Sequence, residues 1–195
     1  MSIYMNNGAT TWPKPESVAR AMYDFLTGGG ANVARGSASK RDLKSMDTVL
    51  SCREELVSLF GGWDDDPRYA TFTANVTESI NVVLKGFLKP GMTVLTSSME
   101  HNAMLRPLRR METRGVKVEI APCDEEGFLH PDIFAEALSR TRPDLVILSH
   151  ASNVCGTVQD VETLAGICRE AGVPFVLDCA QTAGILPLDA EKLGL

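Results

Sequence analysis

Short apolar runs alternate with amphipathic segments along most of the chain. Five runs have the composition of strands and cover residues 69–73, 93–98, 116–123, 143–150 and 173–180. The segments between them space their apolar residues three or four positions apart, as a helix does, and cover residues 78–91, 101–115, 130–141 and 160–172. Strands that are apolar on both faces and alternate with helices are typical of a parallel sheet covered on both sides. The pattern therefore predicts an α/β fold with an open, doubly wound sheet.

The first 68 residues have a different texture. An extended lead-in precedes a helix over residues 15–28, a Gly/Ala/Ser-rich loop over residues 28–39 and a long amphipathic helix over residues 40–62. We therefore divide the chain into an N-terminal segment, residues 1–68, and a sheet domain, residues 69–195. The last residues, "DAEKLGL", have the pattern of the start of a further element, so we expect this domain to be incomplete at its C-terminus.

Composition narrows the classes of function. The chain has 195 residues, of which 44% are hydrophobic and 23% charged, as in a compact domain. A formal charge of −6 and the lack of a Lys/Arg block argue against a nucleic-acid partner. The sequence shows no signal peptide and no run long enough to span a membrane, so we expect a cytoplasmic protein. The five cysteines are scattered without a C-x-x-C pair, which indicates reduced thiols rather than disulfides or a zinc site.

Polar residues follow four of the predicted strands, where ligands of open α/β sheets bind. Asn75 is a candidate helix N-cap with Glu78 three residues later, which would leave backbone N–H groups and the Thr77 hydroxyl free for a phosphate. The same residues are equally suited to starting a helix and nothing more. No Walker-type phosphate loop is present.

His101 and Asp178 are the other candidates at strand ends. His101 could stack on a planar ligand or relay a proton, or it could cap a helix. His130 fits a loop residue, and His150 either lies near the site or is a packed strand-end histidine. Asp178 ends an apolar strand and needs a positive partner, either a protonated ring nitrogen or a nearby arginine such as Arg35. A phosphate site, a flat ring and a protonated ring nitrogen together outline pyridoxal 5′-phosphate (PLP).

Six motifs in order resemble those of the class V aminotransferase-fold enzymes, and most closely the cysteine desulfurase and selenocysteine lyase branch. They are "NNGATTWPKP", "ANVARGS", "FTANVTESIN", "TSSMEHNAMLRPL", "LSHASNVCGTV" and "LDCAQTAGILPLD". The resemblance implies the large domain of the type I PLP-dependent transferase fold, incomplete at its C-terminus, with helices on both faces of a mainly parallel sheet. It also implies a homodimer with the active site at the subunit interface.

The resemblance assigns roles to individual residues. Val76, through its N–H, and Thr77 would hold the cofactor phosphate, and His101, the candidate catalytic residue, would stack on the ring. Asn153 would lie near the ring and the substrate, Asp178 would pair with the ring nitrogen, and Gln181 would bind the ring hydroxyl. Asn32 and Arg35 would line the substrate entrance. Cys155 stands where the family often has threonine, and we do not assign it the role of a nucleophile.

One family motif has no counterpart in the chain. In the family, PLP is bound to a lysine in a "GHK"-type motif beyond the aspartate, whereas here only Lys192 follows Asp178, in "AEKLGL". The sulfur-accepting cysteine loop and the small C-terminal domain are also missing. We therefore expect the N-terminal part of a desulfurase-like enzyme that acts on cysteine or selenocysteine and is inactive alone. The alternatives are another class V aminotransferase or selenocysteine lyase, and a non-catalytic remnant or interaction module.

Overall fold

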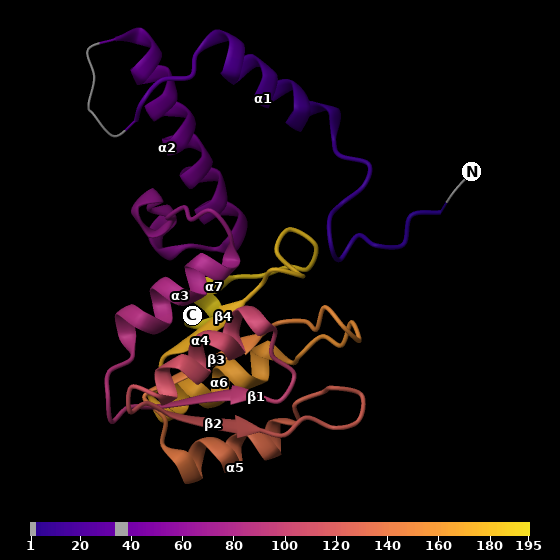
Figure 1. Cartoon of the computed structure of the whole chain (residues 1–195), viewed down its shortest axis with the longest axis vertical. Coiled ribbons are helices and arrows are strands. Elements are labelled where there is room, and N and C mark those ends of the chain that lie inside the picture. The colour runs from indigo at the N-terminus through magenta and orange to yellow at the C-terminus, as the bar shows by residue number, and fades with distance from the viewer. Residues whose placement is uncertain (1–2, 34–38) are drawn as a thin grey trace. The chain divides into compact units, whose positions relative to one another are not determined.

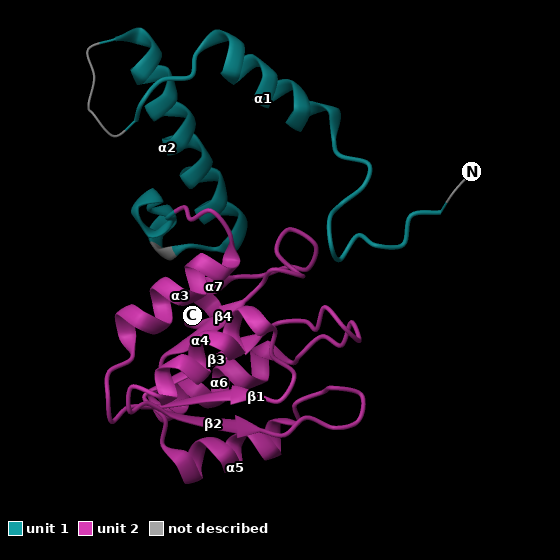
Figure 2. Cartoon of the chain, viewed as in Figure 1, with its two compact units in different colours: residues 1–71 teal, residues 72–195 magenta. Residues whose placement is uncertain are grey.

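The computed structural model describes residues 3–33 and 39–195 and divides the chain into two compact units. They are Met1–Thr71 and Phe72–Leu195 (Figure 2). The division falls between Thr71 and Phe72, whereas the sequence pattern placed it after residue 68. Each unit is described separately.

The first unit is helical. It contains α1 (Glu16–Gly28) and α2 (Lys40–Phe60), followed by two 3₁₀ turns, η1 (Trp63–Asp65) and η2 (Pro67–Tyr69). The α2 helix begins where the Ser39 hydroxyl oxygen accepts a hydrogen bond from the Asp42 N–H at 3.2 Å. It ends at Gly61, whose φ of 60° is left-handed, as is common in the residue after a helix. Both helices predicted for this region are confirmed.

The second unit is a parallel sheet with helices. Its strands are β1 (Thr93–Ser97), β2 (Lys117–Ala121), β3 (Leu145–Ser149) and β4 (Phe175–Asp178), in the order β2-β1-β3-β4, and every pairing is parallel. Its helices are α3 (Val76–Phe87), α4 (Asn102–Glu112), α5 (Pro131–Thr141), α6 (Val161–Ala171) and α7 (Ala190–Leu193) (Figure 1). The predicted α/β class is confirmed.

Adjacent residues of the central strands face opposite sides of the sheet, so each strand serves two cores. Val94, Leu145 and Ile147 pack with α3 and α4 in one cluster of buried residues. Leu95, Val146 and Leu148 pack with α5 and α6 in the other. Figure 1 shows α5 on the other side of the sheet from α3 and α4. Burial on both faces explains why these strands have apolar residues at adjacent positions, such as Val94 and Leu95.

The strand predicted over residues 69–73 does not form. Tyr69 ends the turn η2, and the chain then runs without regular structure to Asn75. The polar groups of this stretch bond to the start of α3 instead of to a strand. The Thr73 hydroxyl lies 2.6 Å from the Ser79 hydroxyl, and the Ala74 N–H donates to Glu78 Oε2 at 2.8 Å. A β-prone composition is not enough where local capping bonds satisfy the backbone.

None of the helices in the described residues is both long and apolar enough to cross a membrane.

Candidate active site at the carboxyl edge of the sheet

Three strands end in polar residues at the same edge of the sheet. The register pairs Ser149 of β3 with Asp178 of β4, and Ser97 of β1 with Ala121 of β2. Because all four strands are parallel, their carboxyl ends and the segments that follow them meet at this edge. The sheet therefore gathers here the residues that the sequence placed after separate strands.

The start of α3 is built to leave donors exposed. Asn75 Oδ1 accepts from the Glu78 N–H at 3.0 Å, while Glu78 reaches back to the N–H of Ala74 rather than that of Asn75. The first N–H groups of a helix have no partner within the helix, and the Asn75 cap binds only that of Glu78. Val76, which is 40% exposed, and Thr77 occupy the first two positions of α3. An anion could bind at their N–H groups and at the Thr77 hydroxyl.

His101 caps α4. Its Nδ1 accepts a hydrogen bond from the Ala103 N–H at 3.0 Å, so the neutral ring carries its proton on Nε2. The ring is exposed and lines, together with Thr77, a groove of about 390 Å³ between α3 and α4. The cap, one of two roles that the sequence left open, is thus present. The structure also brings the predicted phosphate site and the predicted ring-stacking residue to one groove.

Asp178 is half-buried at the last position of β4. Its Oδ1 accepts from the Ala180 N–H at 2.9 Å, and its backbone carbonyl accepts from the His150 N–H at 2.9 Å. No ion pair of Asp178 occurs among residues 3–33 and 39–195. Gln181, also half-buried, lies in the turn that follows, where the Thr182 N–H donates to the Cys179 carbonyl. The hydrogen bond from Ala180 therefore fixes the carboxylate at this edge of the sheet.

Asn153 lies in a tight loop after β3. The loop is closed by an antiparallel bridge between Ala151 and Val158 and by a 3.0 Å hydrogen bond from the Ser152 N–H to the Thr157 carbonyl. Asn153 is exposed at its tip. The buried Gln159 side chain anchors the base, because its oxygen accepts from the Leu129 N–H and its amide donates to the Gly127 carbonyl, each at 2.8 Å. The loop thus holds Asn153 on a supported turn.

The two residues assigned to the substrate entrance lie in the first unit. Asn32 follows α1 in an irregular stretch, and Arg35 lies outside the described residues. The alternative partner for Asp178 that the sequence suggested, Arg35, therefore has no described position. The described residues contain no group of His, Cys, Asp and Glu side chains arranged to hold a metal ion.

Glu100 is a buried residue of this edge that we did not select from the sequence. It is 8% exposed, and its Oε1 accepts from the Ser97 hydroxyl at 2.6 Å. Its Oε2 accepts from the Ser149 N–H at 2.9 Å and from the Ser149 hydroxyl at 2.6 Å. Glu100 thus ties the ends of β1 and β3 together directly before His101. The signal available in the sequence was an acid that follows the two serines at the end of a predicted strand and precedes the start of a helix.

Burial raises the pKa of Glu100 above its ordinary value of 4.5, against the opposing effect of hydrogen bonds from Ser149 and Ser97. The folded protein therefore holds this proton more tightly than the unfolded chain. The contribution to stability is complete below pH 4.5 and is lost as the pH rises through the raised pKa. The free energy of unfolding should therefore decrease as the pH rises through this pKa. We expect Glu100→Gln to remove the part of this decrease that comes from Glu100. Urea unfolding at several values between pH 4 and pH 8 measures it.

The matched control is Glu136→Gln, which changes an exposed glutamate on α5. It should leave the dependence of stability on pH as in the unsubstituted chain. Parallel curves for Glu100→Gln and the unsubstituted chain would show that Glu100 is not the buried acid described above.

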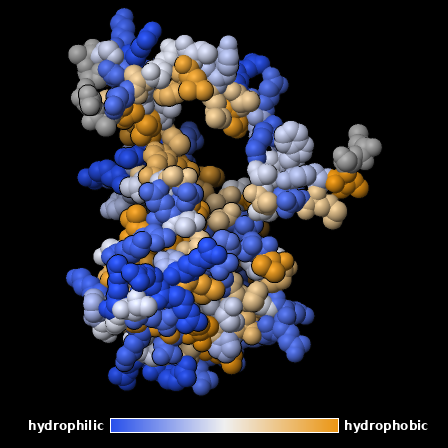
Figure 3. Space-filling view, viewed as in Figure 1, coloured by the Kyte–Doolittle hydropathy of each residue, from blue (hydrophilic) through white to orange (hydrophobic). Residues whose placement is uncertain are grey.

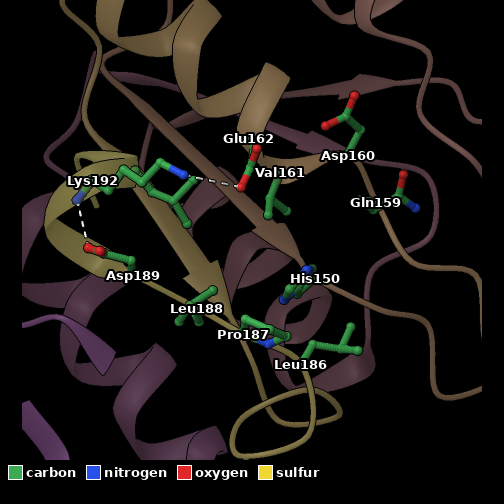
Figure 4. Close-up of a pocket in the computed structure, with 11 residues that line it drawn as sticks. His150, Gln159, Asp160, Val161, Glu162, Leu186, Pro187, Leu188, Asp189 and Lys192 are labelled. Carbon is green, nitrogen blue, oxygen red and sulfur yellow. Dashed lines mark hydrogen bonds and ion pairs between the residues drawn. The ribbon is translucent and has the colours of Figure 1, made fainter. Parts of the chain in front are cut away.

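His150 is the packed strand-end histidine that the sequence suggested. It is 5% exposed, its Nδ1 lies 2.9 Å from the Thr182 hydroxyl, and burial lowers its pKa. It borders a cavity of about 520 Å³, which is also lined by Leu186, Pro187 and Lys192 (Figure 4). The Lys192 ammonium lies 3.7 Å from Glu162 Oε1, and the backbone N–H of Lys192 donates to Asp189 Oδ1 at 2.9 Å. Lys192 is thus engaged near the start of α6.

Cys155 differs from the other thiols in its surroundings. It is exposed beside Asn153, and hydrogen bonds from Ser152 and Thr157 lower its pKa to about 7. Burial raises the pKa of Cys168 to about 12 and that of Cys179 to about 11. Because the thiolate is the reactive form, we expect iodoacetamide at pH 7 to modify Cys155 much faster than these two. Peptide mass spectrometry over time measures the three rates.

The control for this labelling is Cys155→Ser, which should remove the fast phase and leave the slow ones unchanged. Modification of Cys168 or Cys179 at the rate of Cys155 would contradict the assignment.

Comparison with known proteins places this geometry among similar chains. A family profile described as aminotransferase class V matches residues 3–195. A probable cysteine desulfurase of Methanothermobacter thermautotrophicus is 32% identical over 98% of this chain and 47% of its own length. The cysteine desulfurase IscS of Pectobacterium carotovorum is 34% identical over 99% of this chain and 48% of its own length. The chain therefore spans about half the length of the curated relatives it matches.

Solved structures agree with the sequence comparison. The apo cysteine desulfurase of Thermococcus onnurineus is 31% identical with a TM-score of 0.88, covering 98% of this chain and 47% of that one. SspA, solved in complex with cysteine, is 25% identical with a TM-score of 0.88, covering 100% of this chain and 55% of that one. The predicted fold is thus confirmed by proteins that share it over nearly the whole chain.

Proposed function

The chain belongs to the class V aminotransferase family, and from this premise we propose that it is the N-terminal part of a PLP-dependent cysteine desulfurase. The reaction would convert cysteine to alanine and leave its sulfur bound to the enzyme. The observation that carries the proposal is the carboxyl edge of the sheet. A fixed carboxylate, Asp178, ends β4 at this edge, and His101, which comes after β1, lines one groove with Thr77 of α3.

The residues of this edge fit PLP, which the family implies. The cofactor phosphate needs unpaired donors, which the first turn of α3 offers at Val76 and Thr77. Its ring nitrogen needs an anion, which Asp178 offers without an ion pair among the described residues. PLP, when bound, supplies an electron sink for the bonds at the substrate α-carbon. We propose that these three residues hold it.

The remaining candidate residues orient the ring and the substrate. His101 offers an exposed imidazole for stacking, since its Nδ1 is already bound to Ala103 and its orientation is set by the cap. Gln181 supplies an amide for the ring hydroxyl, and Asn153 supplies one near the substrate. The Asp178 carboxylate would keep the proton on the ring nitrogen, because a negative charge nearby favours the protonated form of the ring. The family resemblance assigns Asn32 and Arg35 to the substrate entrance.

Lys192 does not take the part of the covalent lysine in this proposal. It is the only lysine after Asp178, and it is paired with Glu162 at the start of α6. We expect the chain by itself to bind PLP reversibly and to leave cysteine unchanged. Borohydride reduction of the chain with PLP, followed by peptide mass spectrometry, tests this. A stoichiometric adduct on Lys192 would contradict it.

The proposal extends to assembly and location. Val82, Val83 and Phe87 of α3 are 61%, 37% and 40% exposed, and a partner surface would bury them. These exposed side chains support a homodimer, and sedimentation velocity measures the oligomeric state.

The five cysteines are all free thiols in the described residues, which is consistent with a protein of the reducing cytoplasm.

The activity is tested on the protein expressed from its complete reading frame. Incubation with cysteine and PLP should yield alanine and, with a thiol reductant, an equal amount of sulfide. Transamination without sulfide would overturn the proposal in favour of another class V aminotransferase. A strong preference for selenocysteine would indicate a selenocysteine lyase, and no reaction with any amino acid would indicate a non-catalytic protein.

A further inference from the structure

The groove between α3 and α4 extends well beyond the proposed phosphate site. From α3 it is lined by Thr77, Asn81 and Lys85, and from α4 by Arg106 and Arg110. Spacings of four residues place each set along one face of its helix. Thr77 and Lys85 are eight residues apart, which is about 12 Å along a helix. A single phosphate at Thr77 therefore does not reach the far end of the groove.

The far end carries only positive charge. Of the side chains that line the groove, none is acidic, whereas Lys85, Arg106 and Arg110 are cations and Asn81 and Asn102 can donate hydrogen bonds. None of these three cations takes part in the ion pairs found in the described part of the chain. By contrast, the neighbouring Arg109 lies 3.1 Å from Glu112. Hydrophilic side chains gather over the region of α4 (Figure 3), whereas α3 also exposes Val82, Val83 and Phe87.

Three like charges around one groove repel one another unless an anion lies between them. The chain as a whole has a formal charge of −6, so a cluster of three cations is not what its average composition would give. The N-terminus of α4, at Asn102 and Ala103, also borders the groove and adds the positive end of a helix dipole. Guanidinium groups bind phosphate oxygens in pairs, and two arginines one helical turn apart suit two linked phosphates.

We propose that the α3–α4 groove is a second anion site, which binds a pyrophosphate-type group through Lys85, Arg106 and Arg110. This group comes from inorganic pyrophosphate or from a nucleoside diphosphate. The site is adjacent to the proposed cofactor phosphate but does not share its ligands. It does not depend on the cysteine reaction, and it stands if the protein proves to catalyse a different one.

Isothermal titration of the full chain with inorganic pyrophosphate at low salt tests the site. We expect saturable binding of one pyrophosphate, and about tenfold or greater weakening in Arg110→Gln and in Lys85→Gln, because each loses a charged hydrogen-bond donor. The matched control is Arg114→Gln, which removes the same charge just beyond the end of α4, at a residue that does not line the groove. It should change the affinity less than twofold.

Several outcomes would overturn the proposal. Equal weakening in Arg110→Gln and Arg114→Gln would show attraction to net charge only, and a lack of saturation would show no site. Complete displacement of pyrophosphate by PLP, or loss of pyrophosphate binding in Thr77→Val alone, would place the pyrophosphate at the start of α3.

A second titration, with ADP and AMP, separates the two possible sources of the pyrophosphate group. Tighter binding of ADP than of pyrophosphate indicates a nucleotide, and equal binding of the two indicates the free anion.

Discussion

Replacing Asp178 by asparagine is expected to weaken the binding of PLP about 10- to 150-fold, since a hydrogen bond to a charged group contributes about 1.5–3 kcal/mol. In the protein expressed from its complete reading frame, alanine formation from cysteine should fall by at least the same factor, because the ring nitrogen is no longer kept protonated. The binding constant is measured by absorbance titration with PLP, and turnover is measured as alanine released.

The substitution is chosen so that the fold stays intact. Asp178 Oδ1 accepts from the Ala180 N–H, and the asparagine side-chain oxygen can accept the same hydrogen bond. The matched control, Glu170→Gln, makes the same carboxylate-to-amide change at an exposed position in the last turn of α6, and it should leave both measurements unchanged. Unaltered PLP affinity in Asp178→Asn would mean that this carboxylate does not face the cofactor.

Replacing Phe134 by alanine is expected to lower the free energy of unfolding by about 3–5 kcal/mol, the usual cost of removing a buried aromatic ring. Phe134 is 0% exposed and belongs to the cluster between the sheet and the helices α5 and α6. A domain is typically stable by only about 5–15 kcal/mol in total, so the loss is a large part of what the fold has. Urea unfolding followed by circular dichroism measures it.

The neighbouring Ile133 provides the control for this prediction. It is 37% exposed on the same helix, so Ile133→Ala removes an aliphatic side chain that is only partly buried and should cost much less. Equal losses for the two variants would contradict the assignment of Phe134, rather than Ile133, to the core.

The sequence predicts the sheet well because its signal is physical and local. Val94 and Leu95 are adjacent, and both are fully buried because they face opposite cores. The same holds for Ile147 and Leu148 on β3. Consecutive apolar residues of this kind make β1 and β3 recognisable without their neighbours, whereas β2, "KVEIA", was predicted from its alternation of polar and apolar residues.

The prediction of a strand over residues 69–73 was wrong because it rested on local composition alone. Its β-prone residues are an isolated local pattern, and a strand also needs a partner strand, which no local pattern specifies. Thr73 and Ala74 bond instead to the first turn of α3. The capping prediction for Asn75, which depends only on residues within one turn, was confirmed.

The candidate site shows the same division between local and long-range signals. His101 and Asp178 were predicted because each stands at or shortly after the end of a strand. Glu100 was missed because its importance comes from Ser149, which is 49 residues away in the sequence. A contact between two strand ends is set by the sheet order, and only the structure reveals it.

The central claim is that PLP lies at the carboxyl edge of the sheet and is held from three sides. A crystal structure of the PLP-loaded protein, expressed from its complete reading frame, tests this most directly. We predict the ring nitrogen within hydrogen-bond distance of Asp178, the phosphate at the N–H groups of Val76 and Thr77, and the ring against His101. A cofactor bound elsewhere, or a ring nitrogen facing away from Asp178, would contradict the account.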